Sequence, residues 1–184
     1  MERVRNREPE ALAALFDRHF DLVFGLAMRL MGDRTLAEDV AQDVFLKVHR
    51  AANRIDPSRD PAPWFTAITY NACRDVWRSG AWRMSRRSRP VDEDPGFGVP
   101  LTRGTNDPED DALASERARL VQDAIRRLPE ALRTPVVLHD YQGLGHPEIA
   151  KLLGVNPAAA RKRYSRALTA LATILEKTLG EAGR

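Results

Sequence analysis

Apolar residues recur at steps of three and four along most of the 184-residue chain, and no segment alternates apolar and polar residues. The first such run consists of Leu12, Leu15, Phe16, His19, Leu22, Val23 and Leu26. This spacing places side chains along one side of an α-helix, whereas a half-buried strand needs a step of two. The sequence therefore predicts an all-α fold.

Glycines and prolines divide these helices into two groups. Gly32 and Asp33 end the first run, a second helix begins near an expected N-cap at Thr35, and a third covers residues 62–79. Residues 53–63 contain three prolines and are predicted to form a loop. Residues 88–107 lack periodicity, and helical spacing resumes near Pro108 with breaks at 128–129, 143–145 and 154–157. We expect two small helical domains, 1–88 and 111–184, joined by a flexible acidic linker, 89–110.

The charge distribution says more than the net charge of +3. Residues 74–89 contain six basic residues and one acid, residues 91–116 contain eight acids and one arginine, and residues 161–166 contain four basic residues and no acid. Two basic segments around an acidic one are typical of two phosphate-facing surfaces. Ordinary solvated surfaces give the same pattern, so charge alone leaves both interpretations open.

Several classes of protein are disfavoured. A single cysteine, Cys73, gives no disulfide framework or cysteine zinc site, and no apolar run approaches the ~20 residues that span a bilayer. The charged N-terminus does not resemble a secretory signal. No glycine-rich phosphate loop is present, and the histidines are scattered at His19, His49, His139 and His146. We therefore expect a cytoplasmic protein without metal, cofactor, membrane insertion or catalytic activity.

Residues 146–168 have the pattern of a helix-turn-helix. Pro147 suits a first helical turn, Gly154 a left-handed C-cap, and Asn156 the N-cap of a second helix. On that helix the apolar positions expected to face inward are Ala160, Tyr164, Leu168, Leu171 and Leu175. The polar positions expected to enter a major groove are Arg161, Lys162, Arg163, Ser165 and Arg166. The alternatives are a helical hairpin with a solvated basic side, or a helix pair that binds protein.

The N-terminal helices carry two further polar surfaces. One consists of Glu38, Asp39, Gln42 and Asp43, whose like charges crowd one side of a helix. Such crowding favours a basic partner, although a soluble acidic surface explains it equally well. The other consists of Asn71, Arg74, Asp75 and Arg78, followed by Trp82 and Arg83. Basic side chains mixed with aromatic rings suit single-stranded DNA. The alternative is that the tryptophans, Trp64 above all, are simply part of the core.

Three segments in a fixed order resemble the extracytoplasmic-function sigma factors of bacterial RNA polymerase. Residues 36–45, LAEDVAQDVF, are similar to the helix that docks on the polymerase β′ coiled coil. Residues 63–75, PWFTAITYNACRD, are similar to the segment that melts and reads the minus-10 element, and residues 128–167 are similar to the region that reads the minus-35 element.

The resemblance assigns roles to the candidate residues. It implies that Asp39, Gln42 and Asp43, with Glu38, contact β′, that Asn71 lies near a displaced minus-10 base, and that residues 53–63 help to form its pocket. It also implies contacts with the β flap, an anti-sigma partner, and a linker that threads toward the active and RNA-exit channels. The chain departs from the family in having alanines at 158–160, where Gly-Thr-Val is usual. The competing function is a conventional helix-turn-helix regulator that binds duplex DNA as a dimer.

Overall fold

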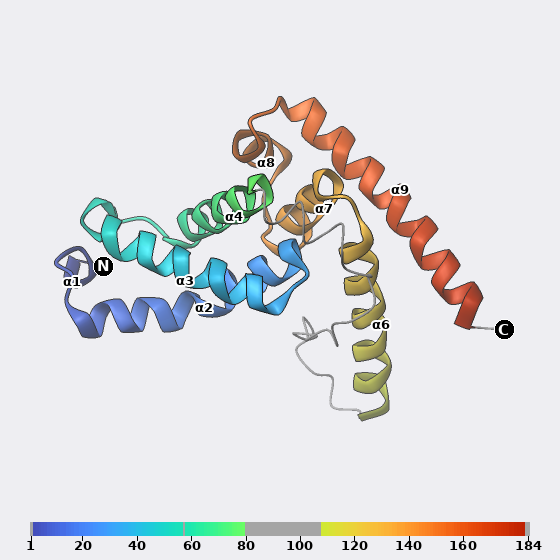
Figure 1. Ribbon diagram of the computed structural model, residues 1–184, viewed down its shortest axis with the longest axis horizontal. Coiled ribbons are helices and arrows are strands. Elements are labelled where there is room, and N and C mark those ends of the chain that lie inside the picture. Colours follow the sequence, from blue (N-terminus) through green and yellow to red (C-terminus); the bar gives the residue numbers. More distant parts are fainter. Residues whose placement is uncertain (1, 57, 80–107, 183–184) are drawn as a thin grey trace. The chain divides into compact units, whose positions relative to one another are not determined.

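The computed structural model describes residues 2–56, 58–79 and 108–182, with side chains in the last stretch described for 116–180. The chain divides into two compact units, Met1–Asp92 and Glu93–Arg184. Within the described ranges every regular element is helical, which confirms the all-α prediction (Figure 1). None of the described helices is long and apolar enough to cross a membrane. The predicted linker lies outside the described residues except for 108–110, which begin a helix.

The N-terminal unit is built on three long helices. These are α2 (Pro9–Met31), α3 (Arg34–Ala51) and α4 (Ala62–Arg78), preceded by α1 (Glu2–Arg5) and with the 3₁₀ turn η1 (Ala52–Arg54) after α3. Each long helix packs against the other two. The fully buried side chains between them include Val23, Leu26 and Leu30 of α2, Val44 and Val48 of α3, and Phe65 of α4. Burying this apolar area drives the packing, since each such side chain contributes about 1.5–3 kcal/mol.

The corner between α2 and α3 is a two-residue turn. Gly32 adopts a left-handed φ of 69°, and its N–H donates to the carbonyl of Met28. Asp33 then caps α3, because its Oδ1 accepts a hydrogen bond of 3.0 Å from the N–H of Leu36. The sequence predicted Thr35 as the N-cap of α3, but the N-cap in the structure is Asp33. The aspartate carboxylate accepts a hydrogen bond from a backbone N–H of the first turn that has no partner within the helix, and its negative charge is stabilised by the positive end of the helix dipole.

The short helix α1 was not predicted, because four residues are too few to show a period. Its Val4 is 4% exposed and therefore belongs to the core. Arg7, at a φ of 59°, donates from Nη2 to the carbonyl of Arg50 at 3.1 Å. α1 also lies against η1, so the N-terminal segment covers the end of the three-helix core.

The C-terminal unit consists of α6 (Pro108–Arg127), α7 (Glu130–Val136), the π-helical turn η2 (Val137–Tyr141), α8 (His146–Leu153) and α9 (Pro157–Ala182). Helices α6, α7 and α8 all pack on α9. The fully buried side chains include Ile125, Leu128, Leu138 and Ile149. Arg133 is 3% exposed, and its Nη2 donates to the carbonyls of Arg126 and Leu128 at 2.8 and 2.9 Å. A buried guanidinium thus satisfies carbonyls at the end of α6.

The buried side of α9 differs from the prediction in one respect. Ala160, Ala167 and Leu171 are buried and Tyr164 is half-buried, but Leu168 is 44% exposed. A period of 3.6 residues requires occasional steps of three, and after Tyr164 the inward position falls on Ala167. Leu168 was therefore wrongly assigned to the core. The helix continues to Ala182.

Candidate nucleic-acid and polymerase interface

The acidic stripe of α3 (Glu38, Asp39, Gln42 and Asp43) lies on the outside of the N-terminal unit. The first three side chains are exposed, and the side chain of Asp43 is half-exposed. Two members of the stripe form ion pairs with basic residues of the same helix. Glu38 Oε1 lies 2.8 Å from Arg34 Nε, and Asp43 Oδ2 lies 2.7 Å from Lys47 Nζ. Such exposed pairs are each worth at most about 1 kcal/mol, so a stronger basic partner can replace them.

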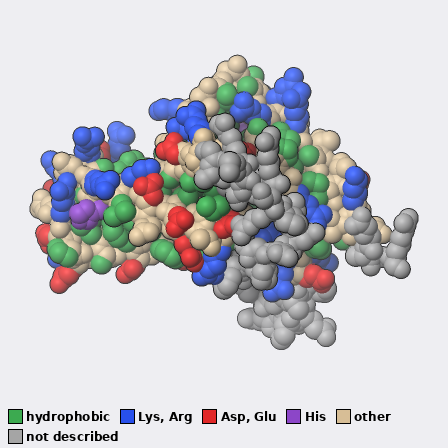
Figure 2. Space-filling model, in the orientation of Figure 1, with side chains coloured by type: hydrophobic (Ala, Val, Ile, Leu, Met, Phe, Trp, Pro, Cys, Tyr) green, Lys and Arg blue, Asp and Glu red, His purple; other side chains and the backbone are tan. Residues whose placement is uncertain are grey.

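Apolar side chains border the acidic stripe, a feature that the sequence analysis missed. Leu46 follows Asp43 on the same side of α3 and is 50% exposed. Phe20 of α2 is 48% exposed, and its ring stacks on Phe45 at a centroid distance of 6.2 Å. Figure 2 shows acidic, basic and apolar side chains interspersed over the visible side of this unit. The surface therefore combines charge with exposed apolar area, the composition of a protein-binding site.

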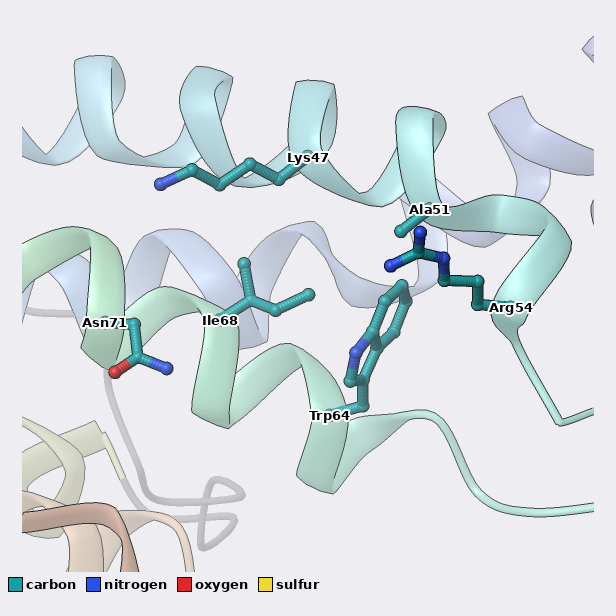
Figure 3. Close-up of a pocket in the computed structure, with 6 residues that line it drawn as sticks. All are labelled: Lys47, Ala51, Arg54, Trp64, Ile68 and Asn71. Carbon is teal, nitrogen blue, oxygen red and sulfur yellow. The ribbon is translucent and has the colours of Figure 1, made fainter. Parts of the chain in front are cut away.

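A pocket of about 410 Å³ opens between α3 and α4. Lys47 and Ala51 come from α3, Arg54 from η1, and Trp64, Ile68 and Asn71 from α4 (Figure 3). The indole of Trp64 stands at one end beside the Arg54 guanidinium, and the carboxamide of Asn71 lies at the other, across from Lys47. The pocket thus offers an aromatic face, an apolar wall, two cations and a group that both donates and accepts hydrogen bonds.

The pocket corrects the expectation for Trp64. Its side chain is half-buried and lines the pocket, so it is not simply part of the core. Arg54 comes from the segment 53–63 that was expected to form the pocket, but most of the wall is helical. The sequence missed Lys47 and Ile68 as well. Lys47 follows Asp43 by four positions and Ile68 precedes Asn71 by three, but nothing in a single sequence shows that two helices face each other there.

The polar residues predicted along one side of α4 (Asn71, Arg74, Asp75 and Arg78) do not form one continuous exposed surface. Asn71 lies in the pocket, while Asp75 and Arg78 are exposed on the following turns. Asp75 Oδ2 lies 3.9 Å from Lys47 Nζ. Arg74 is half-buried, with its guanidinium carbon 6.0 Å from the centroid of the Tyr70 ring. Trp82 and Arg83, the remaining candidates for minus-10 DNA, lie outside the described residues.

The helix-turn-helix has the expected caps. Gly154 takes a left-handed φ of 67°, and Asn156 Oδ1 accepts a hydrogen bond of 2.8 Å from the N–H of Ala159. On α9 the side chains of Arg161, Lys162, Ser165 and Arg166 are exposed, but Arg163 is half-buried. Figure 2 shows basic side chains over the first half of α9, near the top of the view. Four of the five predicted contact residues therefore face solvent from one helix.

The histidines are less scattered than their sequence positions suggested. His19 is 7% exposed, and its ring stacks on Phe65 at 4.5 Å, where burial lowers the pKa of the imidazole. His139 and His146 stack on each other at 5.0 Å. In the described part of the chain, no three His, Cys, Asp or Glu side chains are grouped so that they could hold a metal ion.

Comparison with known proteins decides what this pair of helical units is. A family model described as Sigma-70 region 2 matches residues 15–83, and one described as Sigma-70, region 4 matches residues 118–171. Over 184 residues the chain is 34% identical to the RNA polymerase sigma factor CarQ of Myxococcus xanthus, and the match covers 100% of both chains. The chain belongs to the extracytoplasmic-function sigma factors.

Two further comparisons agree with this assignment. The chain is 27% identical over 168 residues to the ECF RNA polymerase sigma-E factor of Haemophilus influenzae, covering 91% of this chain and 88% of that protein. Among solved structures, the sigma factor RpoE from Bartonella quintana, in complex with the anti-sigma factor NepR, has a TM-score of 0.61 at 19% identity. That match covers 91% of this chain and 98% of the other, and it shows a shared fold. As a sigma factor, this protein directs RNA polymerase to promoters for transcription initiation, and a dimeric duplex-binding regulator is not favoured.

Proposed function

We propose that the acidic stripe binds the β′ coiled coil of core RNA polymerase. Asp39 and Gln42 are exposed, and Asp43 and Glu38 hold only half-exposed ion pairs with residues of their own helix. Complementary charge accelerates docking and fixes its orientation. Leu46 and Phe20 add the apolar area that the centre of an interface requires.

The pocket between α3 and α4 is the observation that carries the assignment of minus-10 DNA to this unit. A base that leaves the duplex loses stacking worth a few kcal/mol, so it needs a pocket that restores these contacts. Trp64 offers a face for stacking, Asn71 can pair with the edge of a base, and Lys47 and Arg54 can bind the flanking phosphates. The protein would stabilise melted DNA by capturing a base of the non-template strand.

The strand would leave the pocket along the exposed turns of α4. Arg78 supplies a phosphate contact there, and Asp75 with Lys47 limits the positive charge beside it. Arg74, Trp82 and Arg83 remain proposed contacts with minus-10 DNA. The domain boundaries at 88 and 111, and the role of the acidic linker as a mimic of nucleic acid in the polymerase channels, are likewise proposals.

The recognition helix α9 would read the minus-35 element in the major groove. Arg161, Lys162, Ser165 and Arg166 are exposed on its first half, where arginine and lysine can donate to guanine O6 and N7 or to phosphates. Arg163, being half-buried, is the weakest candidate of the five. The same unit would contact the β flap of polymerase.

Other proposed properties follow from the family. The Bartonella quintana relative is bound to an anti-sigma factor, so we expect a protein of that class to control this chain. The protein would act in the cytoplasm, where polymerase is, and would bind without catalysing a reaction of its own.

Two substitutions test the proposal with matched controls. Asn71→Ala should reduce promoter opening by holoenzyme, measured by permanganate reactivity of unpaired thymines, while Asn6→Ala, at an exposed position outside the pocket, should not. Asp39→Lys should weaken binding to core polymerase about 10-fold or more, since it places like charge against a basic partner. Glu10→Lys, at an exposed position near the start of α2, should leave that affinity unchanged. Equal behaviour of test and control variants would contradict the assignment.

A further inference from the structure

Small side chains form the contact between the first half of α9 and the rest of the C-terminal unit. Ala160 and Ala167 are both fully buried there, and their methyl groups allow close approach without fixing the rotation of the helix. Between them, at steps of four and three, lies the half-buried Tyr164. It is the one aromatic side chain among the described residues of this half of α9. Any control of helix rotation by a directional contact therefore falls mainly to Tyr164.

Tyr164 belongs to a polar aromatic group, called here the Tyr164 cluster, with His139 and Asp140 of η2 and His146 of α8. The Tyr164 hydroxyl donates to Asp140 Oδ1 at 2.8 Å, and His139 Nδ1 lies 2.7 Å from the same oxygen. The tyrosine ring lies 4.5 Å from the His139 ring and 5.4 Å from the His146 ring, centroid to centroid. One side chain of α9 thus contacts both preceding elements of the motif.

Backbone hydrogen bonds hold the end of η2, which carries His139 and Asp140, in place. The N–H of Gly143, at a φ of 67°, donates to the carbonyl of His139 at 3.0 Å, and the N–H of Leu144 donates to the carbonyl of Leu138 at 3.1 Å. This pattern closes a helix end rigidly. Burial, followed by the hydrogen bond to Asp140, raises the pKa of Tyr164, so the phenol remains a protonated donor at neutral pH.

The rotation of α9 matters because base readout tolerates little displacement. On a helix with a radius of about 5–6 Å including side chains, a rotation of about 20° moves a surface atom by about 2 Å. A hydrogen bond to a base edge does not survive that shift, whereas a lysine or arginine can still reach a phosphate.

We propose that Tyr164 is a positioning residue for promoter recognition: its hydroxyl, bound to Asp140, fixes the rotation of α9 and so aligns Arg161, Ser165 and Arg166 with base edges. The inference rests on the proposed role of α9 in reading the minus-35 element. Tyr164 acts on sequence discrimination and leaves the general affinity for DNA unchanged.

The test uses holoenzyme assembled from the full chain and core polymerase. Genomic fragments enriched by the wild-type holoenzyme define a preferred duplex, and a duplex with a scrambled minus-35 block serves as the reference. Tyr164→Phe should lower the ratio of the two affinities about 3- to 10-fold, as expected for one lost hydrogen bond, without changing binding to the scrambled duplex or its salt dependence. Tyr141→Phe is the matched control, because its hydroxyl accepts a hydrogen bond of 2.8 Å from Gln122 Nε2 of α6.

Asp140 variants separate positioning from general stability. Asp140→Asn keeps an acceptor for the Tyr164 hydroxyl and should retain the ratio of the two affinities, whereas Asp140→Ala should lower this ratio. Asp140→Ala combined with Tyr164→Phe should lower the ratio no further than either substitution alone. An unchanged ratio in Tyr164→Phe, or an equal loss on both duplexes, would overturn the inference. Arg166→Ala serves as the reference for α9 itself: if it too leaves the ratio unchanged, the proposed minus-35 function fails and takes the inference with it.

Discussion

Replacing Asp43 with asparagine should make the free sigma factor bind single-stranded DNA more tightly. Lys47 lines the pocket, yet its Nζ lies 2.7 Å from Asp43 Oδ2 and 3.9 Å from Asp75 Oδ2. A strand that needs the ammonium group must first break these pairs. Since Asp43 is also a proposed polymerase contact, docking on polymerase would release Lys47 in the same way.

The magnitude follows from the exposure of the pair. The side chains of Lys47 and Asp43 are 40% and 50% exposed, and pairs of this kind contribute about 0.2–1 kcal/mol. Removing the carboxylate should therefore tighten binding about 1.4- to 5-fold. Because Lys47 then faces a phosphate instead of a carboxylate, the dependence of log affinity on log salt should steepen by up to about 0.7, the value for one phosphate on a single strand.

Fluorescence anisotropy of a labelled random-sequence single-stranded oligonucleotide, titrated with the full chain at several salt concentrations, measures both quantities. Asp39→Asn is the control, because it removes the same charge from the same helix, and no described side chain pairs with Asp39. Lys47→Gln should abolish the gain when combined with Asp43→Asn. If Asp39→Asn tightens binding as much as Asp43→Asn, the effect is one of net charge, and the reasoning about Lys47 is wrong.

Three further predictions concern stability, each measured by urea unfolding of the full chain. Burial lowers the pKa of His19 below its usual 6.5, so protonating this imidazole costs more in the folded than in the unfolded state. The free energy of unfolding should therefore be constant above pH ~6.5 and fall as the pH drops below it. His19→Gln should remove this dependence, and His49→Gln, at an exposed position, should not. Arg133→Met should cost about 2–3 kcal/mol by leaving two carbonyls at the end of α6 without their charged donor, and a loss below ~0.5 kcal/mol would refute this. Gly154→Ala should cost about 1–2 kcal/mol through its left-handed φ alone, whereas Gly180→Ala, inside α9 with open space around it, should stabilise by about 0.5–1 kcal/mol; changes of the same sign would contradict the argument.

Local signals in the sequence predicted the helices and several of their ends well. The breaks at Gly32 and Gly154 depend on one residue's backbone conformation, and the cap at Asn156 depends on one side chain, so a single sequence contains the information. The errors at Thr35 and Leu168 are shifts of one or two positions. Asp33 caps α3 in place of Thr35, and tertiary packing buries Ala167 in place of Leu168.

The pocket and the Tyr164 cluster were beyond such reasoning. Lys47 and Asn71 meet only because α3 and α4 lie side by side, and the sequence does not contain that register in readable form. Similarly, His139 and His146 are seven positions apart with a turn between them, so no helical period connects them. The resemblance to sigma factors supplied the roles of Asp39 and Asn71, which periodicity alone left undecided.

The two-residue corner between α2 and α3 also limits how relatives of this protein can diverge. Where a residue inserted at this corner joined the start of α3, it would turn the rest of that helix by about 100°, which would bury Asp39 or Asp43 and expose Val40 or Val44. The segment between η1 and α4 has no such constraint, since its described residues are mostly exposed and its length does not set the phase of a buried helix. Insertions and deletions should therefore accumulate beside the pocket and be absent at the corner, so that lineages change the promoters they recognise while keeping the same enzyme.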